Sequence, residues 1–294
     1  MSLDVTTLAL TCLALLGAGY LVVGLLLLVP AGAPAAREIL PILNMEAVIV
    51  GTVTGAVWLG GWVTVLAALA LVARTGYEAA SVTIKDGAPG AWYGFAAGLV
   101  GLSLAASFLP LFWLCLLALA VLGAALAVLF LKDAGNAAAN LIAFPAVPLV
   151  VLAAAAIRGD VAAWLLVAFF LVETFDSYAL LGGKLFGRRK AFPALSPNKT
   201  VEGLLAGAVM LMLTAAIVGW LLADLPALGS MALALFAGVL TVTGDLAASR
   251  LKRAAGVKDY PHLMRHQGGL LDITDAWIAT GAGVICLVAL TGLA

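Results

Sequence analysis

The feature that most limits how this chain can fold is a series of uncharged apolar stretches that recurs along its whole length. A helical stretch of about 20 apolar residues matches the thickness of the hydrocarbon core of a bilayer. The mean hydropathy of +1.18 and the 10% share of charged residues lie outside the range of soluble domains. The apolar runs are continuous and do not alternate with a period of two, which argues against a β-barrel. The sequence therefore predicts an all-α, polytopic integral membrane protein.

On this criterion the sequence predicts about nine transmembrane helices, over residues 5–29, 44–74, 91–109, 111–131, 139–157, 161–183, 203–223, 227–247 and 274–293. The second stretch is too long for one straight crossing, so we expect it to tilt or to break at Gly60-Gly61. The first stretch follows no positive charge and shows no small-residue cleavage site, so we interpret it as a retained span.

The distribution of basic residues predicts which loops share a side of the membrane. With nine spans and a cytoplasmic N-terminus, thirteen of the 15 basic residues fall on one side, and only Arg37 and Arg158 fall on the other. Cytoplasmic loops carry an excess of Lys and Arg, although contact with anionic headgroups also places such residues next to spans. We therefore expect an integral protein of a bacterial inner (cytoplasmic) membrane with its charged face toward the cytoplasm. A eukaryotic organelle membrane stays open as an alternative.

Charged residues are concentrated in two segments, 176–203 and 245–275, which hold ten of the 15 basic and six of the 15 acidic residues. The first segment begins with Asp176 at the end of a predicted span. A carboxylate is costly there unless it pairs with a cation or binds one. The sequence therefore places the candidate site in these two segments.

The first segment contains a pattern that resembles a helix start. Ser196 is a favourable N-cap residue and Pro197 is favourable at the first helical position. Lys199 and Thr200 are then expected in the first turn, where free backbone N–H groups and the helix dipole favour a phosphate. The Gly-rich loop of a Walker A motif is missing before these residues, so the pattern is a different kind of phosphate site.

The second segment combines carboxylates and cations at helix ends. On a continuing helix, Asp245, Ser249 and Lys252 share one face. Asp272 and Asp275 are three residues apart at the start of the last helix, where they either offset its dipole or hold a cation. Together with the acid at the end of the earlier span, they predict a site for Mg²⁺, which binds carboxylates together with substrate phosphates. A metal flanked by Lys and Arg suits phosphoryl or nucleotidyl transfer.

Both segments carry short motifs in a fixed order. The second segment contains Gly244-Asp245, Ser249, Lys252-Arg253, Lys258-Asp259, Gly268-Gly269, Asp272 and Asp275. The first contains Asp176-Ser177, Gly183, Leu185-Phe186-Gly187, Lys190, Pro193, Ser196-Pro197, Lys199-Thr200 and Glu202-Gly203. In order and spacing these motifs resemble the signature of phosphatidate cytidylyltransferases, the CDP-diacylglycerol synthases. On this basis the chain divides into N-terminal transmembrane helices of unassigned role, 1–135, and a cytidylyltransferase-like catalytic region, 136–294.

The resemblance implies that CTP and a membrane lipid phosphate, phosphatidate or a related one, react to a CDP-lipid and pyrophosphate. It implies Mg²⁺ held by Asp245 and Asp272, and a catalytic set of Lys199, Asp245, Asp272 and Asp275. The implied substrate-binding residues are Asp176, Ser177, Ser196, Thr200, Ser249, Lys252, Arg253, Lys258, Asp259, Gln267, Gly268 and Gly269. A lipid phosphate is ionised near pH 7, so no dedicated general base is required. The expected partners are CTP, the lipid phosphate and the membrane, without nucleic acid, and a homodimer stays open.

Several positions depart from the family pattern. Gln267 stands where the family has His, next to Arg265 and His266, and Ile273 replaces the Arg between the two aspartates. Loss of an Arg removes a bidentate partner for phosphate, so either the acceptor differs or part of the site is rebuilt. Two other functions stay open: a transporter whose acids bind a translocated cation, and a degenerate homologue that binds nucleotide or lipid without turnover. Glu78, after the second stretch, either lines a lipid entrance or faces water.

Overall fold

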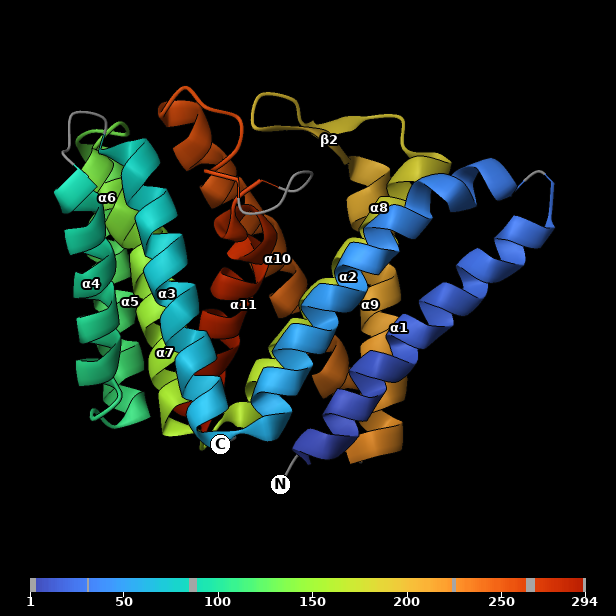
Figure 1. Cartoon of the computed structure of the whole chain (residues 1–294), viewed down its shortest axis with the longest axis horizontal. Helices are drawn as coiled ribbons and strands as arrows, with labels where there is room; N and C mark the ends of the chain where they lie inside the picture. The colour runs from blue at the N-terminus through green and yellow to red at the C-terminus, as the bar shows by residue number, and fades with distance from the viewer. Residues whose placement is uncertain (1–3, 31, 85–88, 224–225, 263–267, 293–294) are drawn as a thin grey trace.

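The computed structural model describes residues 4–30, 32–84, 89–223, 226–262 and 268–292, which form a bundle of long helices with a short hairpin at one end (Figure 1). The helices are α1 (Val5–Leu28), α2 (Ala33–Leu59), α3 (Gly61–Thr83), α4 (Pro89–Ala106), α5 (Leu111–Leu131), α6 (Ala137–Leu141), η1 (Ile142–Ala146), α7 (Val147–Arg158), α8 (Ala162–Phe186), α9 (Val201–Ala223), α10 (Ala227–Ala254) and α11 (Leu270–Thr291). Within the described ranges, nine helical segments are long and apolar enough to cross a bilayer; α2 and α3 are two of them, whereas α4, which covers most of the predicted span 91–109, is not among them. The predicted all-α membrane fold is confirmed.

The long second stretch of the sequence is broken between α2 and α3, at the predicted glycine pair. Gly60 and Gly61 have φ values of +66° and +51°, which L-residues with a Cβ rarely adopt. An added Cβ would meet no atom within 4 Å at either position, so the backbone angle and not space requires glycine. Each of the two helices is long enough to span a bilayer by itself.

This break changes the expected topology, because two helices of opposite direction, α2 and α3, stand where one span was expected (Figure 1). The first turn of α1 and the last turn of α11 lie at the same end of the bundle, and the hairpin lies at the other (Figure 1). Arg37, near the start of α2, lies at the end of the bundle that carries the hairpin. Its neighbour Glu38 forms a 3.8 Å salt bridge with Lys184, which is near the end of α8. The expectation that the N-terminus shares a side with the basic loops, and that Arg37 opposes them, is therefore wrong.

With this correction the segregation of charge becomes sharper. In the described part of the chain, every basic residue except Arg158 belongs to a segment at the hairpin end (Figure 1). Arg158 ends α7 at the opposite end, where its Nη1 donates to the carbonyl of Leu109 at 3.0 Å. We name the end with the hairpin the basic end.

The core of the bundle lies around α7 and α11. Residues 149–156 of α7 are all buried, and α11 packs against α7, α8 and α10. Many of these side chains are small, so the helices can approach closely. Inside a bilayer the hydrophobic effect does not drive helices together, and close packing of this kind holds them instead. The carboxylates of α10 and α11 are therefore carried by helices that are fixed by packing on several sides.

The basic end carries a two-stranded antiparallel hairpin between α8 and α9. Strand β1 (Lys190–Phe192) pairs with β2 (Ser196–Thr200), and Lys190 lies opposite Thr200. The prediction that a helix begins at Ser196-Pro197 is wrong, because this segment forms an edge strand, where a proline is tolerated. Helix α9 begins at Val201, and its cap is Thr200, whose Oγ1 accepts a hydrogen bond from the Gly203 N–H at 3.2 Å.

Candidate functional site

Four charged side chains from four different elements meet near the basic end of the bundle. Lys199 reaches inward from β2, and its Nζ lies 3.3 Å from Oδ2 of Asp245 on α10. Asp176 of α8 and Asp275 of α11 are near enough to act electrostatically on the same ammonium. Lys199 and Asp245 keep only 24% and 25% of their side-chain surface exposed, so this interaction is shielded from water. We name these four residues the central cluster.

The ionisation of Lys199 is governed by the cluster. Burial of the ammonium acts to lower the pKa of Lys199, whereas the carboxylates of Asp176, Asp245 and Asp275 act to raise it. The carboxylates prevail, and the pKa of Lys199 is above its usual value. The lysine therefore remains cationic at neutral pH although it is mostly buried, as a group that neutralises phosphate must.

Two helices approach closely where they carry the acids of the central cluster. A Cβ on Gly244 would lie 2.6 Å from the Cβ of Ala279 and 2.9 Å from the carbonyl oxygen of Asp275. Only a glycine at this position lets α10 pack so tightly on α11. The residue after it, Asp245, is thereby held beside Asp275.

Asp272 is engaged differently from the other predicted catalytic acids. Its Oδ1 lies 2.5 Å from Nζ of Lys252, and its Oδ2 accepts hydrogen bonds from the backbone N–H groups of Tyr260 and Gly269, at 2.9 and 2.8 Å. The Gly269 bond caps the start of α11, and the Tyr260 bond fixes the preceding loop. Both oxygens therefore have partners, and Asp272 joins α10, the loop and α11.

The predicted metal ligands fit a cation unequally. Within the described ranges, no three His, Cys, Asp or Glu side chains are gathered in a group that could hold a metal ion. Asp245 fits Mg²⁺ better than Asp272 does, because its buried Oδ2 has one charged neighbour, Nζ of Lys199 at 3.3 Å, and accepts no hydrogen bond within the described residues. Mg²⁺ needs only one or two carboxylates when substrate phosphates supply further ligands. The donor chemistry therefore suits a metal at Asp245 with Asp275 beside it, whereas Asp272 would first have to release its partners.

Two further acids extend the central cluster toward the membrane interior and were missed by the sequence reasoning. Glu46 of α2 and Glu173 of α8 are near enough to act electrostatically on each other, and each also interacts electrostatically with Asp176. Their signal was present, because each lies inside an apolar stretch where a carboxylate is costly.

Glu78 of α3 has a role that the sequence did not indicate. It is fully buried and accepts hydrogen bonds from the N–H groups of Leu270 at 3.0 Å and Leu271 at 2.7 Å. Arg74, one turn earlier, donates its Nε–H to Glu78 at 2.6 Å. Glu78 therefore caps α11 from a neighbouring helix and does not face water.

The remaining predicted residues lie at varied distances from this centre. Ser249 is buried on α10, Ser177 is exposed on α8, and Ser196 lies at the start of β2. Arg253 is exposed and donates to the carbonyl oxygen of Val257 at 3.0 Å. Lys258 and Asp259 are exposed in the loop, and Gly268 adopts a φ of +76° just before the cap of α11. The predictions for Gln267, and for its neighbours Arg265 and His266, lie outside the described residues.

Comparison with known proteins gives a family match over most of the chain. The model of the cytidylyltransferase family matches residues 43–291. The chain is similar to an uncharacterised protein of Escherichia coli K12, YnbB, with 42% identity over 118 residues, and to the phosphatidate cytidylyltransferase of Bacillus subtilis, with 39% over 113. It is also 37% identical over 133 residues to phosphatidate cytidylyltransferase 5 of Arabidopsis thaliana chloroplasts. These alignments cover 40%, 38% and 44% of this chain, and 40%, 42% and 32% of the respective relatives.

Proposed function

Because the chain belongs to the cytidylyltransferase family, we propose that it transfers a cytidylyl group from CTP to a lipid phosphate in the membrane. An oxygen of the lipid phosphate attacks the α-phosphorus of CTP. The bond from that phosphorus to the oxygen bridging to the β-phosphorus breaks, and pyrophosphate leaves. The observation that carries the proposal is the central cluster, where Lys199 meets Asp176, Asp245 and Asp275 beneath a face rich in cations.

The proposed roles of the residues follow from charge and position. Lys199 and Lys252 neutralise phosphate oxygens, whose charge is spread in the transition state of such transfers. Asp245, with Asp275 beside it, would hold Mg²⁺, and the bound ion would lower the repulsion between the two phosphate groups. Asp272 positions Lys252 and the start of α11 through its three contacts. The lipid phosphate is ionised at neutral pH and needs no general base.

We further propose that the basic end faces the cytoplasm of a bacterial cell. The segregation of Lys and Arg at that end supports this orientation. It would give the cluster access to cytoplasmic CTP, while the acceptor approaches within the bilayer. The reaction involves no nucleic acid. Whether the chain forms a homodimer is tested by light scattering of the purified protein, which measures its molecular mass.

The experiment that tests the function uses purified protein in detergent with Mg²⁺, labelled CTP and a panel of lipid phosphates. At least one acceptor should yield a labelled CDP-lipid. Asp245→Asn should lose activity and bind CTP with a weaker dependence on Mg²⁺. If no acceptor yields a labelled lipid although the protein still binds CTP, the chain is a degenerate homologue without turnover.

The choice of acceptor has a separate test in the residues that depart from the family pattern. Ile273→Arg together with Gln267→His restores the family residues. If the departures encode acceptor choice, the double variant should shift its preference among phosphatidate and other lipid phosphates. An unchanged acceptor profile would remove that explanation.

A further inference from the structure

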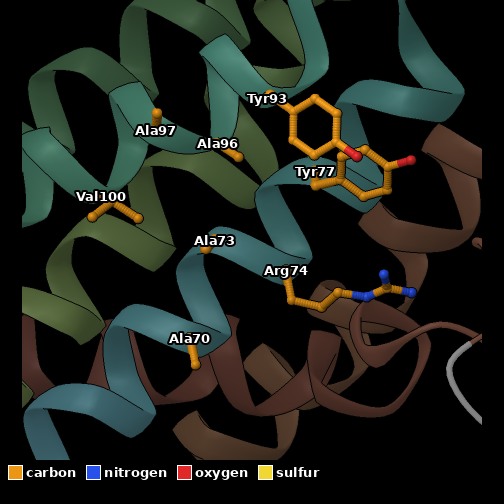
Figure 2. A pocket seen from close by; sticks show the side chains of 8 residues that line it. All are labelled: Ala70, Ala73, Arg74, Tyr77, Tyr93, Ala96, Ala97 and Val100. Carbon is orange, nitrogen blue, oxygen red and sulfur yellow. The ribbon is translucent and has the colours of Figure 1, made fainter. Parts of the chain in front are cut away.

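An open groove between α3 and α4 lies apart from the central cluster. Figure 2 shows this cavity, whose volume is about 740 Å³. Its floor is formed by small side chains of both helices, including Ala70, Ala73, Ala97 and Val100. Ala70 and Ala97 are exposed, so the floor is accessible from outside the protein. We name this cavity the α3–α4 groove.

The rim of the α3–α4 groove gathers hydrogen-bond donors. Tyr77 and Tyr93 lie beside each other, with Arg74 below them on the same side of the view, and Ala70, Ala97 and Val100 lie on the other side (Figure 2). The rings of Tyr77 and Tyr93 are stacked with centroids 5.1 Å apart, and Cζ of Arg74 lies 5.8 Å from the Tyr77 centroid. Neither tyrosine hydroxyl, nor Nη1 of Arg74, makes a hydrogen bond with another described residue. A rim with a cation and two hydroxyl donors complements an anion.

The polar rim and the apolar floor of the groove match the polar headgroup and the apolar chains of a lipid. Its polar rim lies at the depth of the loop before α11, because Nη2 of Arg74 donates to the carbonyl oxygen of Pro261 at 3.1 Å. From Tyr93 to Val100 the floor extends about 10 Å along α4, at 1.5 Å per residue. Tyrosine is typical of the headgroup level of a bilayer, and alanine and valine are compatible with its interior.

A chain of contacts connects the rim to the proposed catalytic region. Arg74 is hydrogen-bonded to Glu78, which caps α11 at Leu270 and Leu271. The next residue, Asp272, is the acid that holds Lys252. A headgroup at Arg74 would therefore lie beside the loop and helix start that carry the catalytic acids.

We propose that the α3–α4 groove binds the lipid phosphate acceptor, with its phosphate at Arg74, Tyr77 and Tyr93 and one acyl chain along the alanine floor. The identification of the occupant as the acceptor rests on the proposed function. A phosphate monoester carries up to two negative charges and three terminal oxygens. The three donor groups of the rim match it better than they match the single charge of a phosphodiester lipid.

The test measures binding without CTP. Wild-type protein in nanodiscs of zwitterionic lipid is titrated with dioleoyl phosphatidate, and dioleoyl phosphatidylglycerol serves as the diester with the same chains. Ala97→Phe fills the groove, and Ala105→Phe, also exposed on α4 but outside the groove, is the matched control. Tyr93→Phe removes one donor and leaves the Arg74–Glu78 contact intact.

Phosphatidate should bind the wild type and Ala105→Phe equally, and Ala97→Phe about tenfold more weakly, which corresponds to about 1.4 kcal/mol. Tyr93→Phe should weaken the binding of phosphatidate more than the binding of phosphatidylglycerol. In turnover, Ala97→Phe should raise the KM for the lipid and leave kcat unchanged. Equal affinity for the diester, or unchanged binding by Ala97→Phe, would overturn the proposal. If Ala97→Phe changes the oligomeric state and leaves lipid binding unchanged, the groove binds a second copy of the chain, and the proposal is likewise overturned.

These outcomes separate the groove from the proposed function. Turnover that is indifferent to Ala97→Phe contradicts the groove alone. Selective binding of phosphatidate that is lost in Ala97→Phe, without any CDP-lipid from any acceptor, supports a lipid phosphate site and contradicts the transfer reaction.

Discussion

Glu78→Ala should destabilise the protein more than any exposed charge substitution. Its carboxylate is fully buried and accepts three hydrogen bonds, from Arg74, Leu270 and Leu271. Removal leaves two N–H groups at the start of α11 and a partly buried guanidinium without their acceptor. Breaking a buried ion pair by removing one partner costs about 3–5 kcal/mol. Glu78→Gln keeps one acceptor oxygen, and we expect it to cost about 1–3 kcal/mol.

The assay is equilibrium unfolding in mixed detergent micelles, followed by tryptophan fluorescence. Glu38→Ala is the matched control, because Glu38 keeps 75% of its side-chain surface exposed and pairs with Lys184 at 3.8 Å. An exposed pair of this kind contributes about 0–1 kcal/mol. If Glu78→Ala loses no more unfolding free energy than Glu38→Ala, then Glu78 does not fix α11, and the reasoning is refuted.

Three further predictions concern the proposed site. Asp272→Asn should abolish turnover and lower the unfolding free energy, because it removes the charge partner of Lys252; full activity would show that neither role is needed. Lys199→Met should abolish turnover. The pKa of Lys199 is raised in the folded state, so the stability that its ammonium contributes is complete below the unfolded-state pKa of 10.5. That stability is lost only as the pH rises through the folded-state pKa. Full turnover by Lys199→Met in the assay with labelled CTP would contradict this role of Lys199. Thr200→Ala should cost about 1 kcal/mol as the loss of the α9 cap, whereas Ser196→Ala should not, and equal costs in thermal unfolding would contradict the observed helix start.

The membrane fold could be predicted because hydropathy is a local property. Each stretch of apolar residues long enough to cross the bilayer forms a helix, since every backbone group must find its partner within the segment. The break at Gly60-Gly61 could also be predicted, because two adjacent glycines tolerate positive φ angles. Its topological consequence was missed, since the sequence did not show that both halves are full-length helices.

Contacts between distant segments could not be predicted. Ser196-Pro197 has the local chemistry of a helix start, but pairing of Lys190 with Thr200 makes the segment a strand. Likewise, nothing in the spacing of Asp272 indicates that the loop at Tyr260 donates to it. Glu78 contacts residues almost two hundred positions later in the chain, and only the packing of α3 against α11 brings them together.

The proposed reaction transfers the cytidylyl group of CTP to a lipid phosphate and releases pyrophosphate. The most direct test is to follow the α-phosphate label of CTP into the lipid phase while measuring pyrophosphate release, with wild-type protein and Asp245→Asn. The wild type should form one labelled CDP-lipid for each pyrophosphate, only when both the lipid phosphate and Mg²⁺ are present, and the variant should form neither product. Pyrophosphate release without lipid labelling, or equal labelling by Asp245→Asn, would contradict the proposed reaction.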